Sequence, residues 1–169
     1  MKKLVVLLMA VSLAGCGYGL VGRTSSLPED VRSIFVSTLT NRTTRTQVDQ
    51  ILTQAIASEF VRRQRFEVVS SRTQADAVLS GAVIAFRVRP VAFGEGTRAT
   101  EYEVFIGAEM EFRRSDGDEV LWQQPNYQFR ETYEASVSEI DFFSREDQAI
   151  SLVADKFAET LVIDILEGF

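Results

Sequence analysis

The chain has 169 residues, of which 46% are hydrophobic and 25% are charged, a balance typical of one ordinary globular domain rather than of a disordered chain. Its formal net charge is −6, it has no histidine, and it has one cysteine. These counts exclude catalytic and zinc sites that need histidine, exclude an internal disulfide, and argue against non-specific binding of nucleic acid.

Residues 1–15 have the composition of a signal peptide. Lys2 and Lys3 precede an apolar run, Leu4 to Leu13, which is too short to span a bilayer as a helix. Without the two lysines, 16 basic residues face 24 acidic ones, so the remaining chain is acidic, with a net charge of −8.

The cysteine follows this run directly. Leu13-Ala14-Gly15-Cys16 resembles a bacterial lipobox. The resemblance implies cleavage before Cys16, a diacylglyceryl group on its thiol and an acyl chain such as palmitate on its new amino terminus, which together anchor a protein firmly. Gly17 stands where an aspartate would resemble an inner-membrane retention signal, so an outer-membrane address is favoured. The alternative is an ordinary secretory signal peptide with a chance cysteine.

Residues 16–29 are expected to be the lipidated cysteine and a tether, because this stretch holds many Gly, Ser and Thr residues and ends near Leu27-Pro28. Residues 30–169 are expected to fold as a single α+β domain. Within it, Ser33 to Leu39 is rich in β-branched and aromatic residues and predicts a strand.

A helix is predicted from about Thr46 to Arg63, because apolar residues recur there at helical spacing. Thr44 and Gln47 resemble a capping box at its start. The basic residues Arg62, Arg63 and Arg65 fall at its end, where cations are favourable; a ligand site there is the alternative. Phe66 to Val69 predicts a second strand.

The next segments predict further strands. Ala77 to Phe93 is too rich in Val and Ile for a convincing helix. From Tyr102 to Phe112, apolar residues alternate strictly with mostly charged ones, which predicts a strand with one buried face. A turn at 115–118 leads into a return strand from Val120 that continues past Pro125 to Tyr133.

A last amphipathic helix is predicted from about Arg145 to Leu166. The order is therefore β-α-β-β-β-β-α. The compact arrangement of these elements is an α+β fold with both helices packed on one face of a mixed, mostly antiparallel β-sheet, whose other face stays open.

Several short motifs resemble one family in order along the whole mature chain. They are Cys16-Gly17-Tyr18, Leu27-Pro28-Glu29, Leu39-Thr40-Asn41-Arg42-Thr43, Glu59-Phe60, Arg65-Phe66, Ala75-Asp76-Ala77-Val78-Leu79-Ser80-Gly81, Thr100-Glu101-Tyr102, Val120-Leu121-Trp122 and Leu166-Glu167-Gly168-Phe169. Together they resemble the LPS-assembly lipoprotein family, LptE.

This resemblance implies an outer-membrane, periplasm-facing lipoprotein that lodges inside the LptD β-barrel, supports the assembly of that barrel and helps to deliver lipopolysaccharide to the outer leaflet. It implies no catalysis. It also implies no cofactor beyond the covalent lipid on Cys16, and no nucleic-acid partner.

A surface that contacts lipopolysaccharide phosphates must be local in so acidic a chain. The candidates are Arg87 and Arg89, which share one strand face, and Arg98 in the neighbouring loop, because guanidinium groups bind phosphate through paired hydrogen bonds. The alternative is that these arginines form a solvated strand end. Arg113, Arg114 and Arg130 are weaker candidates, because nearby carboxylates could neutralise them.

Aromatic residues admit two interpretations. Phe105 lies on the polar face of its strand and is either part of a partner-contacting surface or a singly exposed side chain. Tyr127, Phe129 and Tyr133 are either barrel contacts or core residues, with the core favoured.

Two other functions stay open. The segments Ile34-Phe35-Val36 and Arg65-Phe66-Glu67-Val68-Val69 also resemble curli-secretion-type or TolB-like lipoproteins, which would make the chain a homo-oligomer or an interaction module. An enzyme would need an acid/base pair, for which Glu101, Glu103, Glu109 and Glu111 are available. Because these glutamates alternate along one strand face, solvent exposure explains them better.

Overall fold

The computed structural model describes residues 27–94, 98–117, 119–134 and 142–168, with the backbone alone over 142–149. Its elements are β1 (Ser33–Val36), β2 (Thr40–Asn41), α2 (Val48–Arg63), β3 (Glu67–Val68), the short 3-10 helix η1 (Arg72–Gln74), β4 (Ala77–Phe93), β5 (Ala99–Arg114), β6 (Val120–Glu134) and α3 (Phe142–Glu167). This order confirms the predicted one, with β2 as an additional short strand.

The sheet has six strands, and five of them follow the order β3-β1-β4-β5-β6. The short strands β1, β2 and β3 pair in parallel, β1 with both β3 and β4, and β2 with β4. The long strands β4, β5 and β6 form an antiparallel meander. The sheet is therefore mixed and mostly antiparallel, as the sequence predicts.

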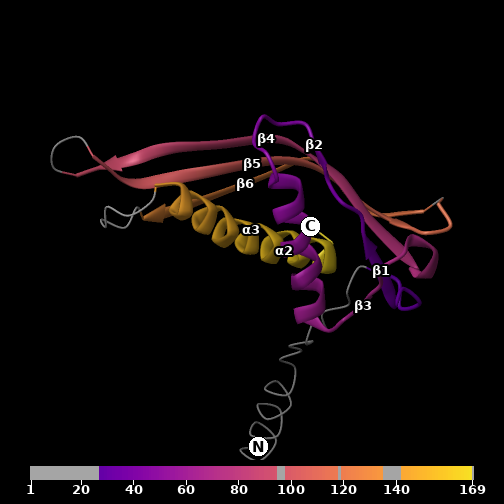
Figure 1. Ribbon diagram of the computed structural model, residues 1–169. Coiled ribbons are helices and arrows are strands. Elements are labelled where there is room, and N and C mark those ends of the chain that lie inside the picture. Colours follow the sequence, from indigo (N-terminus) through magenta and orange to yellow (C-terminus); the bar gives the residue numbers. More distant parts are fainter. Residues whose placement is uncertain (1–26, 95–97, 118, 135–141, 169) are drawn as a thin grey trace, which may run out of the picture.

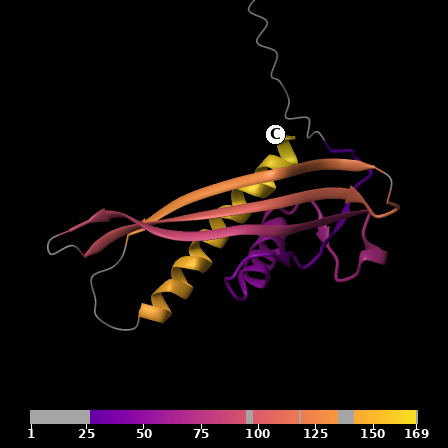
Figure 2. The same ribbon diagram turned by 90° about the horizontal axis from the view of Figure 1, so that it is seen from above.

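Both helices lie on the same face of this sheet (Figure 1). Seen from above, the three long strands cross over α3 and α2, and the β4–β5 hairpin extends beyond them (Figure 2). No strand or helix among the described residues covers the opposite face, which we call the open face. The predicted arrangement is confirmed.

The core lies between the sheet and the helices. Eight apolar residues at helical spacing form one buried stripe along α3, as expected for the predicted amphipathic helix: Ile150, Val153, Ala154, Phe157, Ala158, Leu161, Val162 and Ile165. On β5 the alternating residues from Val104 to Phe112 are at most 2% exposed. This confirms the assignment of its two faces.

The aromatic residues of β6 serve mainly this core. Tyr127 and Phe129 both meet Phe157 of α3 edge to face, with ring centroids 5.6 and 5.7 Å apart. The hydroxyl of Tyr127 also donates a 2.8 Å hydrogen bond to Asp164. Burial and this carboxylate raise the pKa of Tyr127. Tyr133 is partly buried, packs against the same core and stacks on Tyr102.

The two ends of α2 differ from expectation in detail. The predicted capping box is wrong, because Gln47 is itself the N-cap residue, with φ at 64° and no capping side-chain hydrogen bond. At the C-terminal end, the buried Glu59 accepts hydrogen bonds from Nε of both Arg62 and Arg63 at 2.6 Å. The basic run thus pairs with a carboxylate on its own helix, as well as lying in the favourable last turn.

Asp76 joins the start of β4 to the start of β1. Its carboxylate accepts hydrogen bonds from the backbone N–H of Arg32 at 2.9 Å, the backbone N–H of Ser33 at 2.8 Å and the Ser33 hydroxyl at 2.9 Å. These contacts hold the pKa of Asp76 below its usual value. They also position the chain where it enters the sheet, next to the buried residues Leu27 and Val31.

Neither α2 nor α3, the helices found in the described part of the chain, is long and apolar enough to cross a membrane.

Candidate functional site

The candidate site is the open face of the meander, where polar side chains from β4, β5 and β6 lie in rows across the strands. Strand register defines each row, because residues that pair directly place their side chains on the same face. Arg87 pairs with Phe105, and Phe105 with Arg130. Arg89 pairs with Glu103 in the next row. The predicted candidates Arg87 and Arg89 therefore share the open face.

The first row is a stack of two cations on one ring. The guanidinium carbon of Arg87 lies 5.1 Å from the centroid of the Phe105 ring, and that of Arg130 lies 4.8 Å from it. Both distances are within the range of a cation–π interaction. Arg87 and Arg130 are exposed, whereas Phe105 is half-buried.

Arg89 has a different environment. Its Nε donates a 2.8 Å hydrogen bond to Glu103, so its charge is compensated, although its side chain is 69% exposed. Arg98 lies at the end of the β4–β5 hairpin and is exposed; its carbonyl oxygen accepts a 2.9 Å hydrogen bond from the N–H of Gly94. The structure thus keeps all three candidates accessible, but it separates Arg98 from the row and neutralises Arg89.

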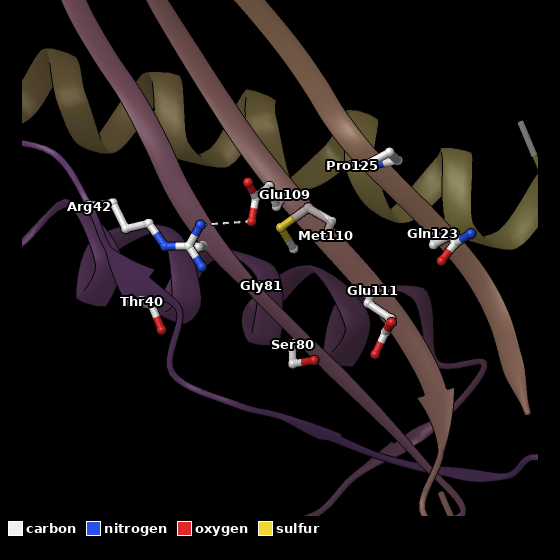
Figure 3. A pocket seen from close by; sticks show the side chains of 10 residues that line it. Thr40, Arg42, Ser80, Gly81, Glu109, Met110, Glu111, Gln123 and Pro125 are labelled. Carbon is white, nitrogen blue, oxygen red and sulfur yellow. Dashed lines mark hydrogen bonds and ion pairs between the residues drawn. The ribbon is translucent and has the colours of Figure 1, made fainter. Parts of the chain in front are cut away.

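A shallow hollow of about 320 Å³ lies further along the same face (Figure 3). The small residues Ser80, Gly81 and Ala82 of β4 are among its lining residues, and so are Arg42 and Glu109, which pair at 2.9 Å. A Cβ atom at Gly81 would lie 2.3 Å from the backbone oxygen of Glu109, so this position requires glycine.

Three of the four glutamates available for an acid/base pair are held in ion pairs. Glu103 pairs with Arg89, Glu109 with Arg42, and Glu111 with Arg113 at 2.9 Å. The Arg113 guanidinium lowers the pKa of Glu111, whereas a general acid needs a raised one. In the segments that the structure describes, no group of three or more acidic or cysteine side chains is placed to hold a metal ion.

A second hollow of about 360 Å³ lies between the helices. Glu59 and Arg62 of α2, and Leu152 and Lys156 of α3, are among its lining residues. Glu59 is already engaged by two arginines, so the hollow offers no free buried polar group from that residue.

The predicted lipidation site, Cys16, lies outside the described residues. So does most of the predicted tether, 16–29; of its described part, Leu27 is buried at 4% exposure, Pro28 is half-buried and Glu29 is exposed.

Sequence reasoning undervalued two residues of the row. Arg130 is only a weaker candidate by sequence, and Phe105 is equally well explained there as a singly exposed side chain. The signal that unites them with Arg87 is register, because three residues on three strands form a row only once the pairing is known. That pairing shifts at irregularities between Val83 and Ala85 and between Ala108 and Met110, so counting residues back from the turns does not give it.

Solved structures with a similar fold include a single-substitution variant of the PelC dodecamer from Paraburkholderia phytofirmans, which is 19% identical at a TM-score of 0.52 over 83% of this chain and 91% of that one. The hypothetical protein CT253 from Chlamydia trachomatis is 6% identical, with a TM-score of 0.55 over 82% and 97%. Rare lipoprotein B from Shewanella oneidensis is 16% identical, with a TM-score of 0.44 over 79% and 92%. For the first two, with TM-scores above 0.5, the likeness at these identities concerns the fold alone.

No curated protein matches the chain. The family model described as "LptE: Lipopolysaccharide-assembly" matches residues 31–165, which include every described helix and strand except the last residues of α3. The chain therefore belongs to the LptE family of lipopolysaccharide-assembly proteins.

Proposed function

We propose that this protein is a lipid-anchored partner of an LptD-type outer-membrane β-barrel, that it plugs this barrel and supports its assembly, and that it helps to deliver lipopolysaccharide to the outer leaflet. The observation that carries the proposal is the family match over residues 31–165. The protein acts by binding and holding, without catalysis.

The anchor belongs to this proposal. Acyl chains on Cys16 would hold the domain at the outer membrane, facing the periplasm, and Gly17 suits that address. A single acyl chain binds a protein to a membrane only marginally, whereas several acyl chains anchor it firmly.

The lipopolysaccharide contact is proposed on the open face. Arg87, Arg89 and Arg98 are exposed there or at the hairpin end, and guanidinium groups donate paired hydrogen bonds to phosphate. The helix-covered face is closed by the core, so a headgroup has access only to the other one.

The test is affinity purification of the full chain from detergent-solubilised outer membranes, followed by intact-mass measurement of what copurifies. The expected result is a stable one-to-one complex with a large β-barrel protein. A matched preparation with Ile106→Asp, a residue 1% exposed, is the control, because an unfolded domain should not retain a specific partner.

Recovery of a homo-oligomer without a barrel protein would contradict the proposal and favour the secretion-lipoprotein alternative. The family match currently favours lipopolysaccharide assembly over that alternative.

A further inference from the structure

The positive charges of the open face are not equivalent. Arg42, Arg89 and Arg113 each pair with a glutamate on this face at 2.8 to 2.9 Å. Within the described ranges, no carboxylate forms an ion pair with Arg87 or Arg130. Among the arginines within β4, β5 and β6, Arg87 and Arg130 are therefore the two whose positive charge no described carboxylate compensates, in a chain that is acidic overall.

Their placement is set by register. Arg87, Phe105 and Arg130 pair directly across β4, β5 and β6, so the two arginines stand on either side of the ring's strand. Neighbouring strands lie about 4.8 Å apart, which puts the two arginine backbones about 10 Å from each other. Both long side chains could otherwise extend into solvent and separate, as like charges do.

The ring of Phe105 draws them together instead. Its centroid lies 5.1 Å from one guanidinium carbon and 4.8 Å from the other. A guanidinium that rests on an aromatic ring uses its planar face, and its N–H donors, which point outward in the plane, stay free for a ligand. The two arginine side chains then lose less conformational entropy when an anion binds, because the ring already holds their N–H donors close together.

We infer that Phe105 is a positioning residue that holds Arg87 and Arg130 as one paired donor set for the phosphorylated headgroup of a lipid, with Arg130 rather than Arg89 as the partner of Arg87. The inference rests on the proposed function, since it takes lipopolysaccharide as the lipid. Phe105 does not itself donate to the ligand; it acts through the two arginines.

Glu103 has the opposite effect on the neighbouring row. It is only 19% exposed and binds Nε of Arg89, so Arg89 gives up a donor and its net charge before any ligand arrives. Arg89 contributes little to the donor set while this pair is intact. Glu103→Gln should release it.

The experiment measures binding of purified lipopolysaccharide to the full lipidated chain in detergent micelles. Arg87→Ala and Arg130→Ala should each weaken binding about tenfold, as expected for a charge-assisted hydrogen-bonded contact. The matched control Arg42→Ala should change it less than about twofold, because Arg42 is paired with Glu109. Arg89→Ala should weaken binding less than Arg130→Ala does, because Glu103 already holds Arg89. Glu103→Gln should strengthen binding about twofold.

The ring is tested by a conservative pair. Phe105→Leu keeps an apolar side chain but removes the π-face, and should weaken binding about three- to fivefold. Phe105→Trp keeps a π-face and should restore wild-type affinity within about twofold. Thermal unfolding of each variant separates this effect from a structural one, since a merely structural role would lower Tm without the rescue by Trp.

Two further ligands identify the chemistry. The wild type should bind lipopolysaccharide stripped of its phosphates at least tenfold more weakly than it binds intact lipopolysaccharide. The wild type and Phe105→Leu should bind the stripped ligand with equal affinity. Inorganic phosphate should compete only weakly. Equal binding of free phosphate and lipopolysaccharide would overturn the headgroup assignment.

The inference is overturned if Phe105→Leu binds like the wild type, if Arg89→Ala costs more affinity than Arg130→Ala, or if the wild type does not bind lipopolysaccharide. Capture of the barrel protein is measured on the same variants and should not change. If the wild type does not capture the barrel protein, the proposed partnership is contradicted. If every variant captures the barrel protein and also binds lipopolysaccharide as tightly as the wild type does, only the inference about the arginine pair is contradicted.

Discussion

At the scale of single residues, Asp76 shows how one carboxylate can join two distant parts of the chain. It accepts three hydrogen bonds from Arg32 and Ser33 at the start of β1, forty-three or forty-four positions earlier in the sequence. All three donors favour the ionised form of Asp76, and its pKa is lowered accordingly.

Asp76→Asn should lower the free energy of unfolding at pH 7 by about 1 kcal/mol, because the charged acceptor is lost. The wild-type contribution is present above the pKa of the unfolded carboxyl, about 3.9, and is lost as the pH falls through the lower folded pKa. Urea unfolding between about pH 2 and pH 7 should therefore show that the free energy of unfolding falls more steeply with decreasing pH for the wild type than for Asp76→Asn. The control is Asp155→Asn, at an exposed position of α3. If the free energy of unfolding depends on pH equally in the wild type and both variants, Asp76 does not have the stabilising role described.

Residues of the candidate site were predicted unevenly. Arg87 and Arg89 share a face because they are two positions apart on a strand, and period-two alternation is readable in sequence. That Glu103 neutralises Arg89, or that Arg130 meets the ring of Phe105, depends on pairing between strands. Such pairing is a long-range property that local patterns do not contain.

At the scale of elements, β5 has the plainest division into two faces. Val104 and Ile106 point to the helices with 0% and 1% exposure, while Phe105 between them faces away. The whole meander depends on this division, since a shift by one residue would exchange the two faces.

Ile106→Asp should unfold the domain, because it buries an unpaired charge at the centre of the core. The matched control is Gln128→Asp, an exposed position on the open face of β6, which should change Tm by no more than a few degrees. Circular dichroism on heating distinguishes the two. A cooperative transition of Ile106→Asp at the wild-type temperature would contradict the face assignment.

Element order and helix bounds follow well from sequence for a physical reason. The stripe of α3 and the alternation of β5 are long and regular, so their periods are unambiguous. The ends of α2 are less regular: a glutamine in a left-handed conformation begins it, and capping patterns did not indicate that. β2 is too short to show any period, and only its parallel pairing with Ala82 and Val83 identifies it.

At the scale of the whole molecule, the proposal requires the domain to stay at a membrane through Cys16. Cys16→Ser should move the protein from the membrane to the soluble fraction, because each buried methylene of the acyl chains contributes about 0.8 kcal/mol to anchoring. Fractionation with immunodetection measures this, with Arg42→Ala as a control that keeps the cysteine. Unchanged fractionation would exclude the lipid as the anchor.

The meander leaves two backbone edges without a strand partner in the described part of the chain: β4 beyond Val83, and the outer side of β6. Unpaired edges invite strands from other copies, and proline, which has no N–H, interrupts such additions. Pro90 interrupts one edge and Pro125 the other. For a chain anchored in a membrane as proposed, where copies diffuse in two dimensions at high local concentration, these two prolines shorten the templates on which lateral aggregation could begin.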